Sequence, residues 1–190
     1  MRYSASHKED TRQRLLHSSG AIAKRGGFAT AGVDGLMKAV GLTGGAFYKH
    51  FSSKDELFAA VVAHELSHSV RMLAGEKGEF SSDKLERCLQ RYLNLGHVQH
   101  PDKGCLLPSL GAEIARADMA VRETAEHWLM KLQQAWAEVL GSEQSAWALL
   151  SQCVGALVVA RMVASEETQQ AIIEASRTMI AETLMTAPGD

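Results

Sequence analysis

The chain has 190 residues, 46% of them hydrophobic, and a formal net charge of −2. This length is enough for one medium domain and a small one, each with its own core. Three cysteines, odd in number and widely spaced, exclude a disulfide framework. No apolar stretch of a signal peptide follows Met1, and the longest apolar run, 146–160, is interrupted and shorter than a membrane span. We therefore expect a cytoplasmic protein without a membrane segment.

Apolar residues recur at helical spacing along nearly the whole chain, and only three prolines interrupt it. The first helix begins at a capping box, Ser6 with Glu9, and ends at Gly26. A second capping box, Ser53 with Glu56, begins the fourth helix. After a linker at 76–82, five helices follow, at Leu85–Tyr92, around Leu110 and Ile114, at Val121–Val139, at about 143–163 and at about 166–185. The sequence predicts an all-α protein of about nine helices.

The second and third helices form the most informative pattern. Apolar residues from Val33 to Val40 lie at helical spacing, and Gly41 supplies the left-handed residue that ends a helix at low cost. Thr43 is a candidate cap for the next helix, whose Phe47 and Phe51 share one face. The opposite side carries polar, basic and aromatic residues. Two helices joined by a glycine-containing turn are the frame that lays its second helix in the DNA major groove.

Particular residues make the frame specific. Four segments resemble the TetR/AcrR family of transcriptional regulators. They are Gly27-Phe28, the Ala39-Val40-Gly41-Leu42-Thr43 turn, Phe47-Tyr48-Lys49-His50-Phe51 and Ser53-Lys54-Asp55-Glu56-Leu57. The similar block covers roughly Ser6 to Val62. The resemblance implies a three-helix DNA-binding head, residues 1–52, and a helical ligand-binding and dimerisation domain, residues 53–190. It also implies a double-stranded DNA operator as a partner.

The head offers candidate contacts to DNA. The small residues that open the third helix expose N–H groups to a phosphate or base edge. Tyr48 and His50 resemble the phosphate-contacting pair of the family, and Lys54 resembles its basic phosphate clamp. Two lysines are candidates for guanine edges, although Tyr48 packed between helices and a solvated Lys49 are the plain alternatives. The full set is Lys38, Thr43, Gly44, Gly45, Tyr48, Lys49, His50 and Lys54.

The net charge divides along the chain. Residues 1–56 hold nine Lys/Arg against five Asp/Glu, a balance of +4, and residues 57–190 hold eleven against seventeen, a balance of −6. A basic head on an acidic body orients the molecule toward phosphate. In so small a head, such a charge balance also arises by chance. The charge therefore supports the DNA-binding interpretation of the motif but does not establish it alone.

Two rival functions are open. His64-Glu65-Leu66-Ser67-His68 matches the H-E-x-x-H signature of zinc hydrolases, and both histidines fall on one helix face. A catalytic zinc needs a third ligand, and neither His97 nor His100 has a usual spacing for one. We therefore expect no metal, no cofactor and no enzymatic activity. The other rival is a helical interaction module that has lost DNA binding.

The eighth helix is apolar almost all round, which favours a partner helix beyond its own chain. The family resemblance implies a four-helix bundle made by the last two helices and their symmetry mates. A two-fold dimer also suits a palindromic operator, although a central core helix of a monomer has the same composition. The candidate interface residues are Trp147, Leu150, Val154, Leu157, Val158, Met162, Ile173 and Ile180.

An apolar pocket is expected among the fifth to eighth helices. The family resemblance implies that a small molecule in it shifts the population of the dimer toward a conformation that releases DNA. The pocket residues are mainly hydrophobic, so a lipophilic or aromatic effector fits them, although each residue also suits ordinary core. The candidates are Tyr92, Cys105, Leu110, Met119, Trp128 and Leu132.

Cys105 is a candidate effector-responsive thiol. If Asp102 caps the sixth helix, Cys105 lies in its first turn, where the helix dipole and Lys103 lower the pKa of a thiol. If Pro108 opens that helix instead, Cys105 lies in the preceding loop and loses the dipole. A Gly-Cys pair here resembles family members that respond to reactive compounds. A small buried apolar residue is nevertheless the commonest role of a free cysteine.

Overall fold

The structure is a computed structural model, and it describes residues 5–74 and 81–185, with side chains from Lys8 onward. These residues form helices and no strand, so the all-α prediction is confirmed. The α-helices are α1 (Ala5–Gly26), α2 (Val33–Ala39), α3 (Lys54–Ala74), α4 (Ser82–Tyr92), α5 (Leu95–Gln99), α6 (Leu107–Arg116), α7 (Met119–Leu140), α8 (Glu143–Met162) and α9 (Glu166–Met185). Two short 3₁₀ helices are η1 (Gly44–Lys49) and η2 (Pro101–Lys103).

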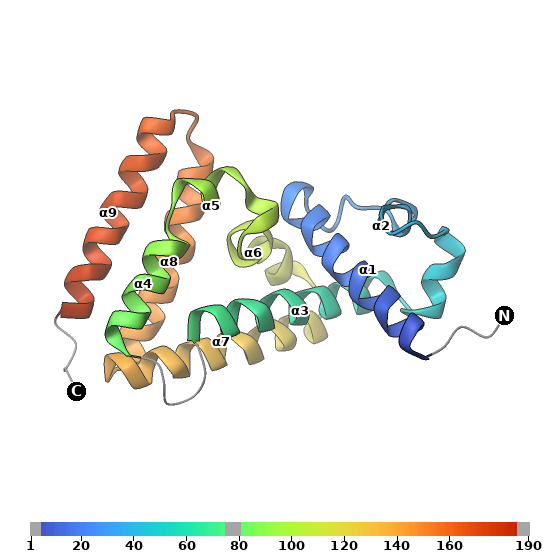
Figure 1. Ribbon diagram of the computed structural model, residues 1–190, viewed down its shortest axis with the longest axis horizontal. Coiled ribbons are helices and arrows are strands. Elements are labelled where there is room, and N and C mark those ends of the chain that lie inside the picture. Colours follow the sequence, from blue (N-terminus) through green and yellow to red (C-terminus); the bar gives the residue numbers. More distant parts are fainter. Residues whose placement is uncertain (1–4, 75–80, 186–190) are drawn as a thin grey trace.

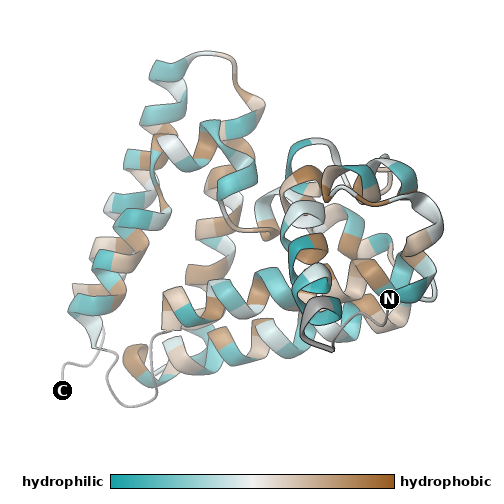
Figure 2. Ribbon diagram, turned by 45° about the vertical axis from the view of Figure 1, so that its right-hand side comes forward, coloured by the Kyte–Doolittle hydropathy of each residue, from teal (hydrophilic) through white to brown (hydrophobic). Residues whose placement is uncertain are grey.

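The molecule is elongated, with α1, α2 and η1 at one end and α8 and α9 at the other (Figure 1). We call the residues of α1, α2 and η1 the head, and those of α4 to α9 the body. Helices α3 and α7 run side by side along the length of the molecule and pack against each other (Figure 1). Hydrophilic and hydrophobic residues alternate along nearly every helix (Figure 2), so each helix has an apolar side to bury.

Glycines shape the head. Gly27 and Gly41 have φ angles of 89° and 77°, the left-handed conformation that strains residues with a Cβ. The amide of Leu42 donates to the carbonyl of Met37 and that of Gly41 to the carbonyl of Lys38, which is the Schellman pattern for ending a helix. The predicted end of the second helix at Gly41 is therefore confirmed.

The recognition segment differs in type from the prediction. It is the 3₁₀ helix η1, not an α-helix, and its two glycines disfavour the α form by about 1 kcal/mol each. Thr43 stands at the N-cap with extended backbone, but its side chain caps no amide among the described residues. Phe47 and Phe51 are both buried, as their spacing predicts.

Helix α3 begins at the predicted capping box with one change. The Ser53 hydroxyl accepts a hydrogen bond from the Glu56 amide (3.0 Å), but the Glu56 carboxylate returns to Ser52, whose amide (2.6 Å) and hydroxyl (2.5 Å) both donate to it. The first capping box lies outside the described side chains at Ser6. Most of the predicted linker, residues 76–80, also lies outside the described residues.

The segment between α4 and α7 holds elements that the sequence did not predict. Helix α5 and η2 occupy residues to which the sequence assigned no helix of their own. Helix α6 begins at Leu107 with Pro108 in its first turn. Asp102 therefore does not cap this helix, and it forms an ion pair with Arg25 of α1 instead (2.7 Å). The prediction that placed Asp102 at the cap is wrong, and the alternative start at the proline is the one observed.

Buried hydrophobic residues form two clusters. The first joins α1, α2, η1 and the start of α3 to Leu106, Leu110 and Ile114 near α6, and to Val121 of α7. The second fills the body between the end of α3 and α4 to α9. The head packs directly on α6 through α1, and α7 joins the same cluster beside α3. The domain boundary after residue 52 stays a prediction.

By length and composition alone, α8 is apolar enough to cross a membrane, a test that core helices of soluble proteins also pass.

Candidate functional site: a basic helix-turn-helix surface and an apolar cavity

The exposed side of η1 carries the predicted polar and aromatic residues. Tyr48 is 72% exposed, and its ring packs edge-on against Phe47 with centroids 5.3 Å apart. Lys38, Thr43, Gly45 and Lys49 are also exposed. An exposed tyrosine beside lysines is a common arrangement for contacting phosphates. The head thus presents an aromatic and basic surface on η1.

Gly44 is half-buried where α2 approaches η1. A Cβ at this position would overlap the carboxylate of Asp34. The glycine therefore allows the two helices of the motif to pack closely, and its candidate role in contacting DNA is unchanged by this packing role.

His50 is the C-cap residue of η1 and lies near several cationic side chains. Its Nδ1 is buried and has no hydrogen-bond partner among the described residues. Burial lowers the pKa of His50, and the charges of Lys8, Arg12 and Lys49 lower it further. The Arg12 guanidinium lies over the Phe51 ring, 4.9 Å from its centroid. Sequence reasoning missed Lys8 and Arg12, although the basic balance of residues 1–56 was a signal for them.

Lys54 holds the loop between α1 and α2. Its ammonium donates to the Ala29 carbonyl (2.9 Å) and lies 5.2 Å from the centroid of the Phe28 ring. On the other side of this loop, the Glu113 carboxylate accepts hydrogen bonds from the amides of Phe28 (3.1 Å) and Ala29 (2.8 Å). The loop is thus fixed to α3 and to α6 at once.

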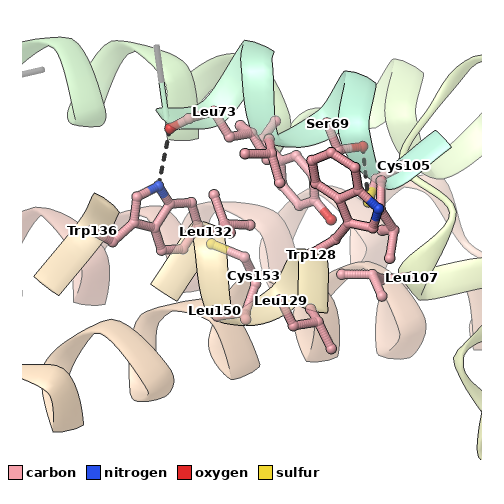
Figure 3. A pocket seen from close by; sticks show the side chains of 13 residues that line it. Ser69, Leu73, Cys105, Leu107, Trp128, Leu129, Leu132, Trp136, Leu150 and Cys153 are labelled. Carbon is pink, nitrogen blue, oxygen red and sulfur yellow. Dashed lines mark hydrogen bonds between the residues drawn. The ribbon is translucent and has the colours of Figure 1, made fainter. Parts of the chain in front are cut away.

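A cavity lies between α3, α4, α7 and α8 in the body (Figure 3). Its free volume of about 10 Å³ is that of a single water-sized space. An effector would therefore have to widen it. The Trp136 indole closes one end by donating to the Leu73 carbonyl (3.0 Å). The lining residues are Leu66, Ser69, Val70, Leu73, Tyr92, Cys105, Leu107, Trp128, Leu129, Leu132, Trp136, Leu150 and Cys153.

Four of the six predicted pocket residues line this cavity: Tyr92, Cys105, Trp128 and Leu132. Leu110 packs in the first cluster instead, because α6 turns that side toward the head. Met119 is 62% exposed at the start of α7. Sequence reasoning missed the wall made by α3, since Leu66, Ser69 and Leu73 lie beyond the part of the helix that resembles the head motif.

Burial in the cavity favours the uncharged forms of Cys153 and Tyr92. Burial raises the pKa of the Cys153 thiol to about 12, with a smaller contribution from Cys105. Burial also raises the pKa of Tyr92, and Cys105 adds to that shift. A neutral, mainly apolar lining with two thiols and a phenol favours lipophilic molecules that accept a hydrogen bond or react with a thiol.

Cys105 lies in the loop before α6, not in the first turn of a helix. The dipole argument for a reactive thiol is therefore removed. The residue is buried, its amide donates to Nε2 of His97 (2.9 Å), and the Ser69 hydroxyl lies 3.7 Å from its Sγ.

The H-E-x-x-H sequence on α3 has a structural role. Glu65 forms a buried ion pair with Lys24 of α1 (2.7 Å), so its carboxylate is engaged. Burial lowers the pKa of His64. Among the described residues, no group of three or more His, Cys, Asp or Glu side chains is placed to hold a metal ion.

The predicted interface residues on α8 and α9 fall into two groups. Trp147, Val158 and Met162 are exposed, the last at 78%, and Val154 is half-buried. Leu150, Leu157, Ile173 and Ile180 are buried within the chain itself. Exposed Val159, Met179 and Met185 extend the apolar surface, and we call these seven exposed or half-buried residues the α8–α9 face. Periodicity alone could not separate the two groups, because α8 is apolar on nearly every side.

The fold and the head surface define a class: an all-helical protein with an N-terminal helix-turn-helix. The family model described as "Bacterial regulatory proteins, tetR family" matches residues 15–61. This region is therefore similar to the DNA-binding helix-turn-helix region of tetR-type regulators.

A curated relative is similar to part of this chain, and solved structures share its fold. The chain is 36% identical over 62 residues to the HTH-type transcriptional regulator SrpR of Pseudomonas putida, a match that spans 33% of this chain and only 29% of the relative. The fold is similar to that of Escherichia coli NemR in its reduced form (TM-score 0.78, 21% identity, 91% of this chain and 96% of that one). It is also similar to a TetR transcriptional regulator of Legionella pneumophila (TM-score 0.75, 18% identity, 96% and 99%).

The cations around His50 predict a measurable shift. Because Arg12 disfavours the imidazolium form, Arg12→Gln should raise the pKa of His50 toward its ordinary value. NMR titration of the His50 ring measures it. Arg25→Gln serves as a control, since Arg25 is paired with Asp102 and does not contribute to His50. An unchanged pKa in Arg12→Gln would show that the cation does not act on this histidine.

Proposed function

We propose that the protein is a sequence-specific transcriptional repressor that binds a palindromic operator as a homodimer and is released by a small lipophilic or electrophilic effector. The observation that carries this proposal is the exposed Tyr48 beside Lys49 and His50 at η1, the second helix of a tetR-type helix-turn-helix. Aromatic hydroxyls, lysines and histidines at this place meet phosphates, which position the protein on DNA. The cytoplasm, where DNA is available, is the proposed place of action, and no cofactor takes part.

Loss of the Tyr48 side chain should weaken DNA binding. A selection of bound genomic fragments identifies the DNA, and Tyr48→Ala should then bind it about tenfold more weakly or worse, since one hydrogen bond to a charged phosphate contributes about 1.5–3 kcal/mol. Tyr48→Phe keeps the ring against Phe47 and removes only the hydroxyl. Similar losses in both variants support a hydroxyl–phosphate contact.

The same selection separates the rival functions. No enrichment of DNA by the unsubstituted protein, or enrichment that Tyr48→Ala leaves unchanged, would favour a helical interaction module that does not use this surface. A zinc hydrolase would require stoichiometric zinc in the purified protein together with peptidase turnover. The ion pair between Glu65 and Lys24 argues against that use of Glu65, because a catalytic base needs a free carboxylate.

The dimer is proposed to form through the α8–α9 face. Exposed apolar residues on two neighbouring helices are typical of a surface that a partner covers. Gly155 is half-buried on α8, and a Cβ there would meet nothing within 4 Å, so a partner helix has room to approach. A two-fold dimer presents two heads, as a palindromic operator requires.

A charge on the α8–α9 face should separate the protomers. Val158 is 37% exposed, so Val158→Glu leaves the protomer core intact but buries a carboxylate in the dimer, which should weaken association by roughly a hundredfold or more. Sedimentation velocity measures the change. Leu157→Glu is unsuitable, because Leu157 is 0% exposed within the chain. Met119→Glu, exposed on α7, is the matched control and should remain dimeric, and a monomeric unsubstituted protein at micromolar concentration would contradict the proposal.

An effector in the cavity would act by preferring a widened conformation in which the heads no longer fit the operator. For an electrophile such as a quinone, the Sγ of Cys105 would add to a ring carbon. The thiol proton would end on one ring oxygen and the hydrogen of the attacked carbon on the other, so that the quinone becomes a hydroquinone thioether. The position of Cys105 in the lining supports this use of the residue, because an adduct there would have to widen the cavity.

Operator release by 1,4-benzoquinone should therefore depend on Cys105. Cys105→Ser should need at least about tenfold more quinone for half-release, measured by fluorescence anisotropy of labelled operator DNA, a shift of about 1.4 kcal/mol. Cys88→Ser, which removes a thiol outside the cavity lining, should respond as the unsubstituted protein does. Equal release from Cys105→Ser and the unsubstituted protein would exclude Cys105 and leave only reversible ligands.

A further inference from the structure

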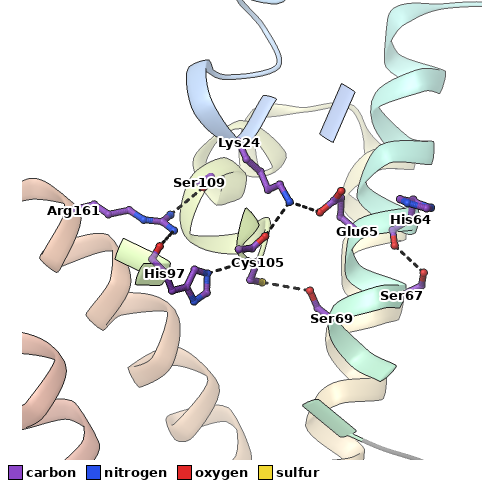
Figure 4. A network of polar contacts seen from close by, with 10 residues as sticks. Lys24, His64, Glu65, Ser67, Ser69, His97, Cys105, Ser109 and Arg161 are labelled. Carbon is purple, nitrogen blue, oxygen red and sulfur yellow. Dashed lines mark hydrogen bonds and ion pairs between the residues drawn. The ribbon is translucent and has the colours of Figure 1, made fainter. Parts of the chain in front are cut away.

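Lys24 is buried at the junction of the head and the body. The residue is 8% exposed, and its ammonium donates to the Glu65 carboxylate of α3 (2.7 Å) and to the Gly104 carbonyl (2.9 Å) (Figure 4). Glu65 fits there because Gly20 has no side chain, since a Cβ on Gly20 would overlap the carboxylate. A lysine is rarely buried unless it is paired. Lys24 has two partners outside its own helix, Glu65 on α3 and the carbonyl of Gly104 just before α6.

The carbonyl that Lys24 holds belongs to the peptide group that joins Gly104 to Cys105. The N–H of the same peptide group, on Cys105, donates to Nε2 of His97 (2.9 Å). A trans peptide is planar, and its C=O and N–H point in opposite directions. One rigid plane is therefore bonded to the head on one edge and to the body on the other. Rotation of this plane weakens both hydrogen bonds together.

The body fixes its side of this plane firmly. Nδ1 of His97 lies 2.7 Å from the Tyr92 carbonyl, so it is the donor there and Nε2 is free to accept from Cys105. Arg161 of α8 donates to the His97 carbonyl (2.8 Å) and to the Ser109 hydroxyl (3.0 Å) (Figure 4). A Cβ on Gly104 would overlap the His97 ring, so the close packing of ring and peptide requires glycine.

The same plane borders the cavity. Cys105 and Leu107 line it, and so does Ser69, which stands four residues after Glu65 on α3. Any occupant that widens the cavity at Cys105 must move the side chain attached to this peptide group. Movement of this peptide group then strains its hydrogen bond to Lys24. Lys24 belongs to α1, whose buried residues pack in the first cluster with the rest of the head.

We propose that Lys24 couples the cavity to the DNA-binding head through the Gly104–Cys105 peptide group, and so acts as a positioning residue for the release of DNA. This inference rests on the proposed function, in which the head binds DNA and the cavity accepts an effector. Two other contacts tie α1 and the loop after it to the same segment: the ion pair between Arg25 and Asp102, and the Glu113 carboxylate. These contacts keep the head attached when Lys24 is replaced.

Coupling is reciprocal, so it is measurable at the cavity without an effector. DNA that holds the head in place should restrain the Cys105 peptide and slow the reaction of Cys105 with N-ethylmaleimide. A Cys88→Ser background removes the half-buried thiol, and Cys153 stays protonated because burial raises its pKa to about 12. Mass spectrometry of the Cys105 peptide gives the rate, with and without the DNA fragment that the selection identifies.

In this background we expect DNA to slow the Cys105 reaction roughly fivefold or more. Lys24→Met with Glu65→Leu replaces the buried pair by apolar side chains and leaves no unpaired charge. It should bind the same DNA and react at one rate with and without it. Arg25→Gln with Asp102→Asn removes the neighbouring pair, which does not touch the peptide group, and should keep the slowing.

Equal slowing in the Lys24 and Arg25 double variants would overturn the role of Lys24. Bound DNA with no slowing in the background protein would overturn the coupling itself, whereas failure of every protein to bind DNA would instead overturn the proposed function. If the Lys24 double variant does not fold, hydrogen exchange of the Cys105 amide in the unsubstituted protein decides the matter. DNA should slow that exchange, and unchanged exchange contradicts the proposal.

Discussion

Helix α3 is the constraint on which the rest of the structure depends. Its 21 residues form a single helix about 30 Å long, and its two ends are buried in different clusters. Leu57, Val61 and Leu66 pack in the first cluster with the head, and Leu73 packs in the second cluster with the body. Because a continuous helix bends little, the head and the body cannot change their relative position without repacking one of these clusters.

The polar contacts at the middle of α3 complete this arrangement. Glu65 faces α1, where it pairs with Lys24, and Ser69 faces the cavity one turn later. A buried ion pair is weak evidence for stability, because desolvation of both charges offsets much of their attraction. Its geometric value is greater, because Lys24 is held between two partners, the Glu65 carboxylate and the Gly104 carbonyl. A small movement of the Gly104–Cys105 peptide group therefore acts directly on Lys24 of α1.

Local patterns in the sequence predicted the elements that local chemistry determines. The glycine turn at Gly41, the buried pair Phe47 and Phe51 and the start of α3 near Ser53 are all observed. The 3₁₀ form of η1 was not predicted, since the four-residue spacing of Phe47 and Phe51 is that of an α-helix, whereas Phe51 lies beyond the end of η1. Helix α5 was missed because its five residues are too few to show a period.

Tertiary contacts determined what the sequence could not predict. Lys24 reads as an ordinary basic residue at the end of a helix, and its burial depends on partners 41 and 80 residues away. Aspartate is a common helix N-cap residue, but Asp102 forms an ion pair with Arg25 instead. On α8, the apolar residues give no sign of which side faces the chain and which side is free, so Leu157 was grouped with Val158 although only Val158 is exposed.

Hydroxyl-radical footprinting on the selected DNA tests the central claim most directly. Two heads on one two-fold dimer should protect two symmetry-related half-sites, with centres separated by about one helical turn, 10–10.5 base pairs, or a multiple of it. Val158→Glu should abolish this paired pattern at the same protein concentration. A single protected stretch without symmetry, or no protection at concentrations that saturate binding, would contradict the account.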